Sequence, residues 1–317
     1  MANDTVTDLI DQQTWLDPVA DWLQKATEAT YGATGDAGQQ VKNLLSGTWL
    51  GHPLHPAVTD VPVGAWTVSL ILDVLEAATG ERTYGVGADV AQGIGLAGAL
   101  GAALSGLNDW HYTVDRQRRV GIAHGLMNLT AAGIYGASSV LRATGARAWG
   151  RRLSYLAYGV AVFSAYVGGE LTYGMRLGVD HAAEEAPEDF TPVVDEAQLA
   201  DGQPRKVDAS GVPVLLVKQA GKIYAMGEVC SHLGGPLSEG TIADGIVTCP
   251  WHGSQFALED GAVVNGPATF AQPCFQTRVR NGKVEVGPRC VAEAAAAVTG
   301  TMPALAQDDQ AVTGARS

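Results

Sequence analysis

The pattern of hydrophobic and polar residues changes once along the chain, at about residue 175. Before this point, four long apolar stretches with few charges follow one another, separated by short polar segments. Each stretch has about 20 residues, the length that an α-helix needs to cross the hydrocarbon core of a bilayer. The pattern predicts a bundle of four transmembrane helices over residues 57–78, 85–107, 120–141 and 152–172.

Aromatic residues near the ends of these stretches support the prediction. Trp and Tyr are enriched where helices leave a membrane, and here they gather at Trp49, Trp110, Tyr112, Trp149 and Tyr173. The alternative is a soluble helical bundle, which Asp60, Asp73 and Asp89 favour because a charge in lipid is costly. All three lie near a stretch end or can face the bundle interior, so we prefer the membrane interpretation.

After the apolar stretches, the pattern predicts a compact all-β domain. Short β-rich runs are broken by Ala-Gly, Asp-Gly and Asn-Gly pairs, which are hairpin signals. We therefore expect a multi-domain protein, in which a four-helix transmembrane bundle precedes a small all-β domain. Five parts are expected in order. They are an acidic, partly amphipathic helical segment (residues 1–48), the membrane domain (49–176), an acidic linker (177–190), the β domain (191–288) and a disordered tail (289–317).

Charge and cysteine usage exclude some classes of protein. The net charge of -13 leaves no basic stripe for a phosphate backbone, so we expect no nucleic acid as a partner. The four cysteines lie in the last third of a long chain, which is not the framework of a small disulfide-rich secreted domain. The first residues lack the basic and apolar regions of a cleaved signal peptide.

The candidate chemistry lies in two loops of the β domain. Cys230 and His232 stand in the first loop, and Cys249 and His252 in the second. Structural zinc is one candidate for two cysteines and two histidines. One thiolate and one imidazole from each loop also suit a [2Fe-2S] cluster, in which both thiolates bind one iron and both imidazoles bind the other. Nearby glycines and prolines let backbone N–H groups approach the sulfurs.

The sequences "CSHLGG" and "CPWHGSQF" resemble the two ligand loops of the Rieske family, and the resemblance extends over about residues 191–288. It implies that Cys230 and Cys249 bind one iron and that His232 and His252 bind the other. It also implies that Ser254 donates a hydrogen bond to a cluster sulfide. Cys274 and Cys290 lie outside the motif, and we expect them to be ordinary thiols.

Departures from the family pattern indicate the type of Rieske domain. Quinol-oxidising members have a disulfide between the loops, but Gly235 and Trp251 occupy the matching positions here. Phe256 replaces a tyrosine that donates a hydrogen bond to a thiolate. Fewer hydrogen bonds lower the reduction potential, so we expect a ferredoxin-like value toward the lower end of roughly -150 to +300 mV.

The membrane part resembles a family of four-helix bacterial membrane domains of unknown function, through "GHPLHPAVTDVPVGAWTVSLILDVL" and related sequence over about residues 48–175. This resemblance implies no chemistry. Four spans, however, would place both termini and five histidines on one side: His52, His55, His111, His124 and His181. Such a face fits a haem, a quinone pocket or a docking surface, and a haem between His55 and His124 is geometrically feasible.

The side of the membrane is less well determined by the sequence. Basic residues are equally frequent at the two ends of the spans, so the positive-inside rule does not decide. The segment "GRRLSYLAYG" can be interpreted as a weak twin-arginine export signal or as a plain basic helix flank. The lack of a signal peptide and of the disulfide between the loops favours a cytoplasmic cluster.

Three functions remain to compare. A Rieske oxygenase needs a further domain with a second iron site, but only about 29 residues follow the β domain. We therefore predict a membrane-anchored carrier, non-catalytic in itself, that relays single electrons between a redox protein partner and the lipid-embedded domain. The alternative is a membrane quinone or haem oxidoreductase, with a second cofactor site formed by His55, His111 or His124.

Overall fold

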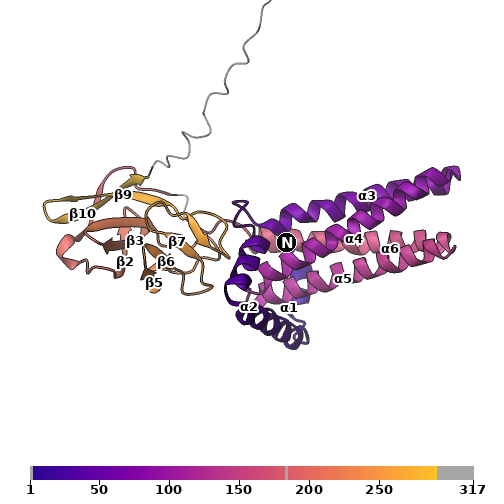
Figure 1. Ribbon diagram of the computed structural model, residues 1–317, viewed down its shortest axis with the longest axis horizontal. Helices are drawn as coiled ribbons and strands as arrows, with labels where there is room; N and C mark the ends of the chain where they lie inside the picture. The colour runs from indigo at the N-terminus through magenta and orange to yellow at the C-terminus, as the bar shows by residue number, and fades with distance from the viewer. Residues whose placement is uncertain (1–2, 183–184, 291–317) are drawn as a thin grey trace, which may run out of the picture.

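The computed structural model describes residues 3–182 and 185–290. Six helices come first and a β-rich domain follows, and Figure 1 shows the two parts placed end to end. The helices are α1 (Asn3–Asp11), α2 (Leu16–Ser46), α3 (Leu54–Thr79), α4 (Arg82–Trp110), α5 (Asp115–Ala143) and α6 (Arg147–Gly169), the last extended by the π-helical turn η1 (Glu170–Gly174).

Helices α3 to α6 form two antiparallel hairpins. Helix α3 packs mainly against α4, and α5 packs mainly against α6. The turn after α3 contains Gly80 and the turn after α5 contains Gly145, with φ of 78° and 90°, a conformation that glycine adopts without steric penalty. Helices α1 and α2 lie at the end of the two hairpins that faces the β-rich domain (Figure 1).

The prediction of four transmembrane helices is supported only in part. Helices α3 and α4 alone are long and apolar enough to cross a membrane by length and composition, among the described residues. Helices α5 and α6 are less apolar because polar residues lie within their apolar stretches. These are His124 and Asn128 in α5, and Ser154 and Ser164 in α6.

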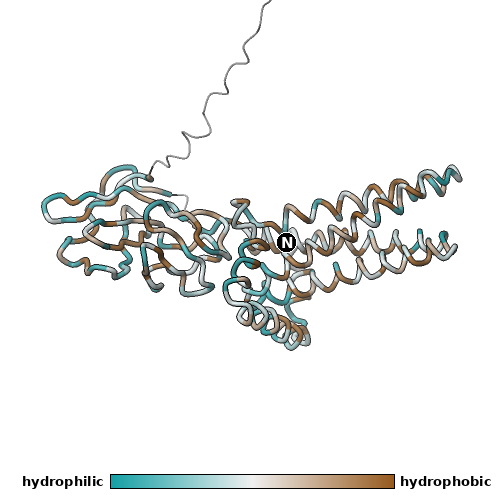
Figure 2. Tube along the Cα trace, in the orientation of Figure 1, coloured by the Kyte–Doolittle hydropathy of each residue, from teal (hydrophilic) through white to brown (hydrophobic). Residues whose placement is uncertain are grey.

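The four long helices nevertheless expose many apolar side chains, and they bury polar side chains together with apolar ones such as Trp66 and Tyr135. Figure 2 shows hydrophobic residues along much of the hairpins and hydrophilic residues at their far tips. Exposed apolar side chains occur on each helix and include Ile71, Val90, Leu100, Leu129, Val140, Leu156 and Val162. Buried polar side chains include Ser69, Asp73, Gln92, Asn108, Ser138, Arg142, Ser154 and Ser164.

A buried network of ion pairs joins the four helices near the end that points away from the β-rich domain. The Arg142 guanidinium donates to the Asp73 carboxylate at 2.9 Å and to Asp89 at 2.9 Å. Arg147 donates to Asp89 at 2.8 Å and to Glu76 at 2.7 Å. Each of these acidic side chains is therefore paired with an arginine, as buried charges require.

The N-terminal segment forms helices α1 and α2 and packs across the base of the hairpins. Leu16 and Ala20 of α2 are buried in a cluster with Trp110 and Ile122. On the polar side, Asp17 accepts hydrogen bonds from Arg119 at 2.9 Å. Trp22, in contrast, is 69% exposed. The segment is thus amphipathic, with one apolar side on the bundle and aromatic residues on its free surface.

The β-rich domain contains two antiparallel sheets. The larger has the order β1-β10-β9-β4-β3-β2, with strands Thr191–Asp195, Lys283–Arg289, Cys274–Arg280, Lys222–Gly227, Val212–Gln219 and Pro204–Ala209. The smaller has the order β5-β6-β7-β8, with strands Thr241–Ala243, Ile246–Thr248, Gln255–Ala257 and Val263–Asn265. Three of the predicted hairpin pairs have positive φ at both residues: Ala220-Gly221, Asp244-Gly245 and Asn281-Gly282.

Alternate residues of β3 face two separate cores, because successive side chains of a strand point to opposite sides. Val214 and Leu216 pack with Phe275 and other residues in one core. Leu215 and Val217 pack with the core that contains both loop cysteines, Cys230 and Cys249. The loops with the candidate ligands are therefore attached directly to a buried core.

The expectation that Cys274 and Cys290 are ordinary thiols is wrong. They form a disulfide, with Cα atoms 5.4 Å apart. Antiparallel pairing of β9 with β10 brings the start of one strand beside the end of the other, which spacing along the chain does not reveal. The disordered tail was expected to begin at residue 289, but Arg289 is the last residue of strand β10. Residues 291–317 lie outside the described residues.

Candidate metal centre

The two loops have the same backbone arrangement. In the first, the Cys230 carbonyl accepts a hydrogen bond from Gly234 N–H at 2.9 Å, and Cys230 N–H donates to Gly235 O at 2.8 Å. In the second, the Cys249 carbonyl accepts from Gly253 N–H at 3.1 Å, and Cys249 N–H donates to Ser254 O at 2.8 Å. Each cysteine is thus bonded to the residues four and five places further on. Two equivalent turns present the two cysteines.

The two thiols face one another. Cys230 and Cys249 are buried and share a hydrogen bond, which raises the pKa of Cys230 and lowers the pKa of Cys249. Backbone N–H groups of His232 and Leu233 also donate to Cys230, and those of Trp251 and His252 donate to Cys249. Such amides stabilise thiolates, the form of cysteine that binds iron.

The two imidazoles lie next to each other and are neutral at pH 7. Their ring centroids are 5.1 Å apart. Burial lowers the pKa of His232 to about 3 and also lowers the pKa of His252. His232 Nδ1 is buried and has no hydrogen-bond partner among the described residues. A buried nitrogen without a partner is costly, so this atom is suited to a metal.

These residues fit a [2Fe-2S] cluster better than a single zinc ion. Within the described ranges, no three metal-binding side chains gather as they do around one ion. A cluster needs only two protein ligands on each iron. Gly235 provides space beside the sulfurs, because a Cβ at this position would lie 2.8 Å from Cys249 Sγ.

Two further positions from the sequence analysis lie beside the loops. Ser254 is fully buried, and its hydroxyl oxygen accepts a hydrogen bond from Ala268 N–H at 3.0 Å. This contact leaves the hydroxyl proton available to another acceptor. Phe256 is fully buried in the core under the second loop. Trp251 is 56% exposed beside His252.

The imidazole edge of the site faces the helical part of the chain. The Tyr112 ring lies 5.3 Å from the His232 ring and 5.4 Å from the His252 ring. His111 lies 3.7 Å from the Tyr112 ring. From the sequence, Tyr112 is expected only as an aromatic residue at the membrane interface. The only sign in the sequence that Tyr112 belongs to the site was its position beside His111, in a short connection between two helices.

Polar contacts hold the two parts together around this edge. His181 N–H donates to Ser231 O at 3.0 Å, next to His232. The Asn43 amide donates to Asn265 at 2.9 Å, and its oxygen accepts from Gly266 N–H at 2.9 Å. The site therefore lies at an interface between the β-rich domain and the helices.

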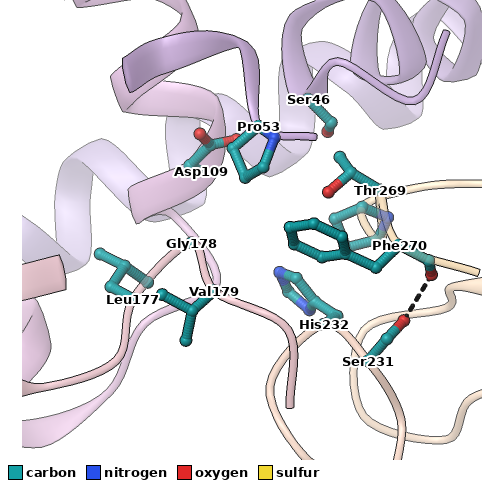
Figure 3. Close-up of a pocket in the computed structure, with 11 residues that line it drawn as sticks. Ser46, Pro53, Asp109, Leu177, Gly178, Val179, Ser231, His232, Thr269 and Phe270 are labelled. Carbon is teal, nitrogen blue, oxygen red and sulfur yellow. Dashed lines mark hydrogen bonds between the residues drawn. The ribbon is translucent and has the colours of Figure 1, made fainter. Parts of the chain in front are cut away.

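Two cavities adjoin the imidazoles at this interface. One, of about 30 Å³, is lined by His232, Phe270, Asp109 and neighbours from both parts, as Figure 3 shows. Burial raises the pKa of Asp109 to about 8. The other, of about 330 Å³, is lined by His252, Tyr112, Val114, Gln117, His181, Leu233 and Trp251.

The other histidines occupy three kinds of position. His111 is buried, and its Nε2 has no hydrogen-bond partner but lies 3.7 Å from Glu28. His55 and His124 are held inside the helical hairpins, where the Nδ1 atoms bond Ala102 O and Ser164 O. His52 is exposed, and His181 Nε2 bonds Arg176 O. The structure thus brings His111 and His181 to the imidazole edge.

Comparison with known proteins agrees with this geometry. Residues 189–276 match the Rieske [2Fe-2S] domain family, and residues 51–181 match a family described as predicted membrane protein (DUF2231). The ferredoxin component of the alkene monooxygenase system of Xanthobacter autotrophicus is 33% identical over 106 residues, 33% of this chain and 86% of that protein. Ferredoxin CarAc of Metapseudomonas resinovorans is 32% identical over 91 residues, 28% of this chain and 85% of that protein.

Other matches share only this domain. Mouse apoptosis-inducing factor 3 is 38% identical over 88 residues, 28% of this chain, and the chain spans only 14% of its length. The solved ferredoxin of carbazole 1,9a-dioxygenase from Nocardioides aromaticivorans is 25% identical, with a TM-score of 0.31, and the match covers 32% of this chain and 99% of that chain.

The chain is therefore a Rieske iron–sulfur protein and belongs to the Rieske [2Fe-2S] family through its C-terminal domain. In particular, it joins a ferredoxin-like Rieske domain to a preceding predicted membrane protein domain. The resemblance inferred from the two loops is confirmed, and so is the Rieske-type [2Fe-2S] cluster as cofactor.

Proposed function

We propose that this protein is a membrane-anchored Rieske electron carrier that relays single electrons between a redox protein and the membrane. The observation that carries the proposal is the contact of Tyr112 with both candidate ligand imidazoles, at 5.3 and 5.4 Å. A freely acting ferredoxin would leave this edge open to its partner. Here the chain's own helical domain covers it.

In this proposal, Cys230 and Cys249 bind one iron and His232 and His252 bind the other. When bound, the cluster supplies a one-electron redox couple. The amides of His232, Leu233, Trp251 and His252 neutralise the negative charge on the sulfurs. The neutral imidazoles point toward Tyr112, which places the helical domain on the shortest path out of the site.

The membrane assignment extends to all four long helices. Exposed apolar side chains and buried polar side chains suit a bundle whose solvent is lipid. Exposed Leu129 on α5 and Leu156 on α6 support this for the second hairpin as well, at 68% and 56% exposure. The Rieske domain and the N-terminal helices then share one side of the membrane. We propose the domain limits given by the sequence pattern, with residues 49–176 in the membrane domain.

The electron partner is proposed to be a separate redox protein. Two relatives are named as ferredoxins, one of them the ferredoxin component of an alkene monooxygenase system. A carrier of this kind exchanges electrons with other proteins rather than transforming a substrate. We therefore propose no catalytic residue in this chain.

The cytoplasmic placement of the Rieske domain loses part of its basis. It rested partly on the absence of one disulfide, but Cys274 and Cys290 form another. Disulfides persist mainly in oxidising compartments, so we propose the outer face of the membrane. Impermeant maleimide labelling of a cysteine at exposed Asp244→Cys in intact cells tests this: rapid labelling supports it, and labelling only after lysis contradicts it.

The proposal as a whole is tested on the full-length protein in detergent, by iron analysis and by oxidised and dithionite-reduced spectra. We expect about two irons per chain and thiolate-to-iron bands that bleach on reduction. Cys230→Ser and His252→Ala should abolish the cluster but leave the protein in the membrane fraction. Cys274→Ser, which removes a cysteine outside the loops, should keep it. An unchanged iron spectrum in either ligand variant would refute the assignment.

A second candidate function is a membrane oxidoreductase in which the Rieske domain passes electrons to a further cofactor. The position of His111 favours it, because this buried residue lies 3.7 Å from Tyr112 on the helical side of the interface. A further cofactor in the helical domain would turn the anchor into an electron acceptor. A quinone at the 330 Å³ cavity beside His252 is one form of this candidate.

A further inference from the structure

Helix α2 has two separate apolar surfaces, and the bundle covers only one of them. Leu16 and Ala20 are buried in the cluster that joins α2 to α4 and α5. Trp15, Val19 and Trp22 follow one another at intervals of four and three residues, so they lie on one face of the helix. Their exposed fractions are 62%, 40% and 69%. These three residues form the outer stripe, which packing on the bundle leaves uncovered.

The acidic side of α2 fixes the direction in which the outer stripe faces. Residues two places apart in a helix point in directions about 200° apart, so Asp17 and Asp21 both lie opposite Val19. Asp17 accepts hydrogen bonds from Arg119 at 2.9 Å, and Asp21 pairs with Arg118. Both arginines lie in the first two turns of α5, at the end of the bundle next to the β-rich domain. The outer stripe therefore faces the other way, along the bundle and away from the β-rich domain.

Helix α1 repeats this arrangement. Asp8 pairs with Arg116 at 2.7 Å, and Asp11 pairs with Arg119 at 3.1 Å. Leu9 lies two places before Asp11, and so on the opposite side of the helix, where it is 57% exposed. Both N-terminal helices therefore direct acidic side chains to the start of α5 and apolar side chains along the bundle.

The bundle surface toward which the outer stripe faces is apolar as well. Leu107 of α4 and Leu126 of α5 pack in the cluster under α2. One turn further from the β-rich domain, Leu104 and Leu129 are 50% and 68% exposed. Because one helical turn rises about 5 Å, the exposed apolar surface of the bundle begins about that far beyond the cluster that α2 covers. The outer stripe is therefore continuous with the surface that the proposed membrane domain presents to lipid.

This position selects a lipid surface as the partner of the outer stripe. Tryptophan side chains favour the boundary between headgroups and acyl chains, and an amphipathic helix lies along this boundary with its apolar side inward. A water-soluble partner would have to enter the space beside Leu104 and Leu129, which the proposed bilayer occupies. We propose that α1 and α2 lie on the membrane surface, with Leu9 and the outer stripe inserted among the phospholipids at the headgroup boundary.

This contact sets the height of the imidazole edge above the lipid. The Gln24 side chain of α2 donates to Thr113 O at 2.9 Å, in the short connection between α4 and α5. Tyr112 belongs to the same connection, and its ring centroid lies 5.3 Å from that of His232. Helices held at the membrane surface therefore hold the Rieske site at a fixed distance from the bilayer. The inference rests on the proposed membrane anchor and adds a second contact with lipid, in the plane of the membrane.

The test is photo-crosslinking of the full-length protein in phosphatidylcholine vesicles, with the photoreactive amino acid p-benzoylphenylalanine (Bpa) at single positions. In Trp22→Bpa, we expect phospholipid adducts on the protein, detected by mass spectrometry. Glu28→Bpa is the matched control, because the Glu28 side chain is 65% exposed but follows Asp21 by two turns on the acidic side of α2. It should give several-fold less lipid adduct. Leu129→Bpa, on the exposed surface of α5, is the positive control for contact with lipid.

Equal lipid yields from Trp22→Bpa and Glu28→Bpa would overturn the inference. Crosslinks from Trp22→Bpa to a second copy of the chain, or in intact cells to another protein in place of lipid, would overturn it as well. A wild-type melting temperature and iron–sulfur spectrum show that each variant is folded. The two proposals fail separately. Lipid adducts in Leu129→Bpa without any in Trp22→Bpa contradict only this inference, whereas their absence from Leu129→Bpa contradicts the membrane anchor and, with it, this inference.

Discussion

Tyr112 of the helical domain lies with its ring edge-on to His252 of the Rieske domain, and the ring centroids are 5.4 Å apart. The same ring is 5.3 Å from His232. One aromatic side chain therefore covers both candidate ligand imidazoles. Both imidazoles remain partly exposed, so the Tyr112 ring shields this edge from an external protein only in part.

Replacement of Tyr112 should expose the imidazoles. In Tyr112→Ala, the free nitrogens of His232 and His252 become accessible, so diethylpyrocarbonate should modify them several-fold faster than in the wild type. Tyr112→Phe keeps the ring and should behave like the wild type. The rate is measured by peptide mass spectrometry on the protein with its cluster.

Tyr173→Ala is the matched control, because Tyr173 is 89% exposed. It should leave the modification rate unchanged. Equal rates in Tyr112→Ala and the wild type would mean that the contact between the domains does not protect the imidazoles in solution.

Gly235 should be essential for the cluster to fit. A Cβ at this position would lie 2.8 Å from Cys249 Sγ and 3.1 Å from Trp251 Cγ. Gly235→Ala should therefore push the loops apart, at a cost of about 1–3 kcal/mol, and lower the iron content per chain. Gly133→Ala, where a Cβ meets no atom within 4 Å, should retain full iron content. A Gly235→Ala protein with two irons and the wild-type melting temperature would disprove this role.

Arg142 should stabilise the helical bundle more than any exposed arginine. Its side chain is 3% exposed and that of its partner Asp73 is fully buried. Arg142→Met leaves this carboxylate without its partner, which should lower the free energy of unfolding by about 3–5 kcal/mol. The measurement is thermal unfolding in detergent.

Two further variants separate charge from packing. Arg152→Met removes an exposed guanidinium that lies 4.5 Å from the Trp149 ring, and should have little effect. The double variant Arg142→Met with Asp73→Leu should recover part of the loss, because the fully buried carboxylate of Asp73 is no longer left without its arginine. Equal destabilisation by the two arginine substitutions would argue against the ion pair as the cause.

Asp109 should make the interface sensitive to pH. Burial raises its pKa to about 8, above the value of about 3.9 in an unfolded chain. Between these values the folded protein retains a proton that the unfolded chain has released, so stability should fall as the pH rises from about 4 to about 8. Asp109→Asn should flatten this dependence, measured as melting temperature against pH. Asp36→Asn, which replaces an exposed carboxyl of α2, should leave the pH dependence unchanged. If Asp109→Asn gave the same slope of melting temperature against pH as the wild type, the Asp109 carboxyl would not be the cause.

The sequence was sufficient for the features that depend on neighbouring residues. Cys230 with His232, and Cys249 with His252, lie in short loops whose hydrogen bonds span four or five residues. Such local geometry follows from the residue types and their spacing, so the cluster was predictable. The long helices were predictable for the same reason, because their hydrogen bonds are local and their length shows in the run of apolar residues.

Only the tertiary structure decided what depends on residues far apart in the chain. It paired Cys274 with Cys290, buried Asp73 against Arg142, and placed Tyr112 on the imidazoles. It also placed His55 and His124 against main-chain carbonyls inside the hairpins. These contacts arise from strand pairing and helix packing, and the spacing of residues along the chain does not specify which distant side chains meet. The sequence alone therefore determined the loops with the candidate ligands and the helices, whereas the packing of the two domains decided which side chains face His232 and His252.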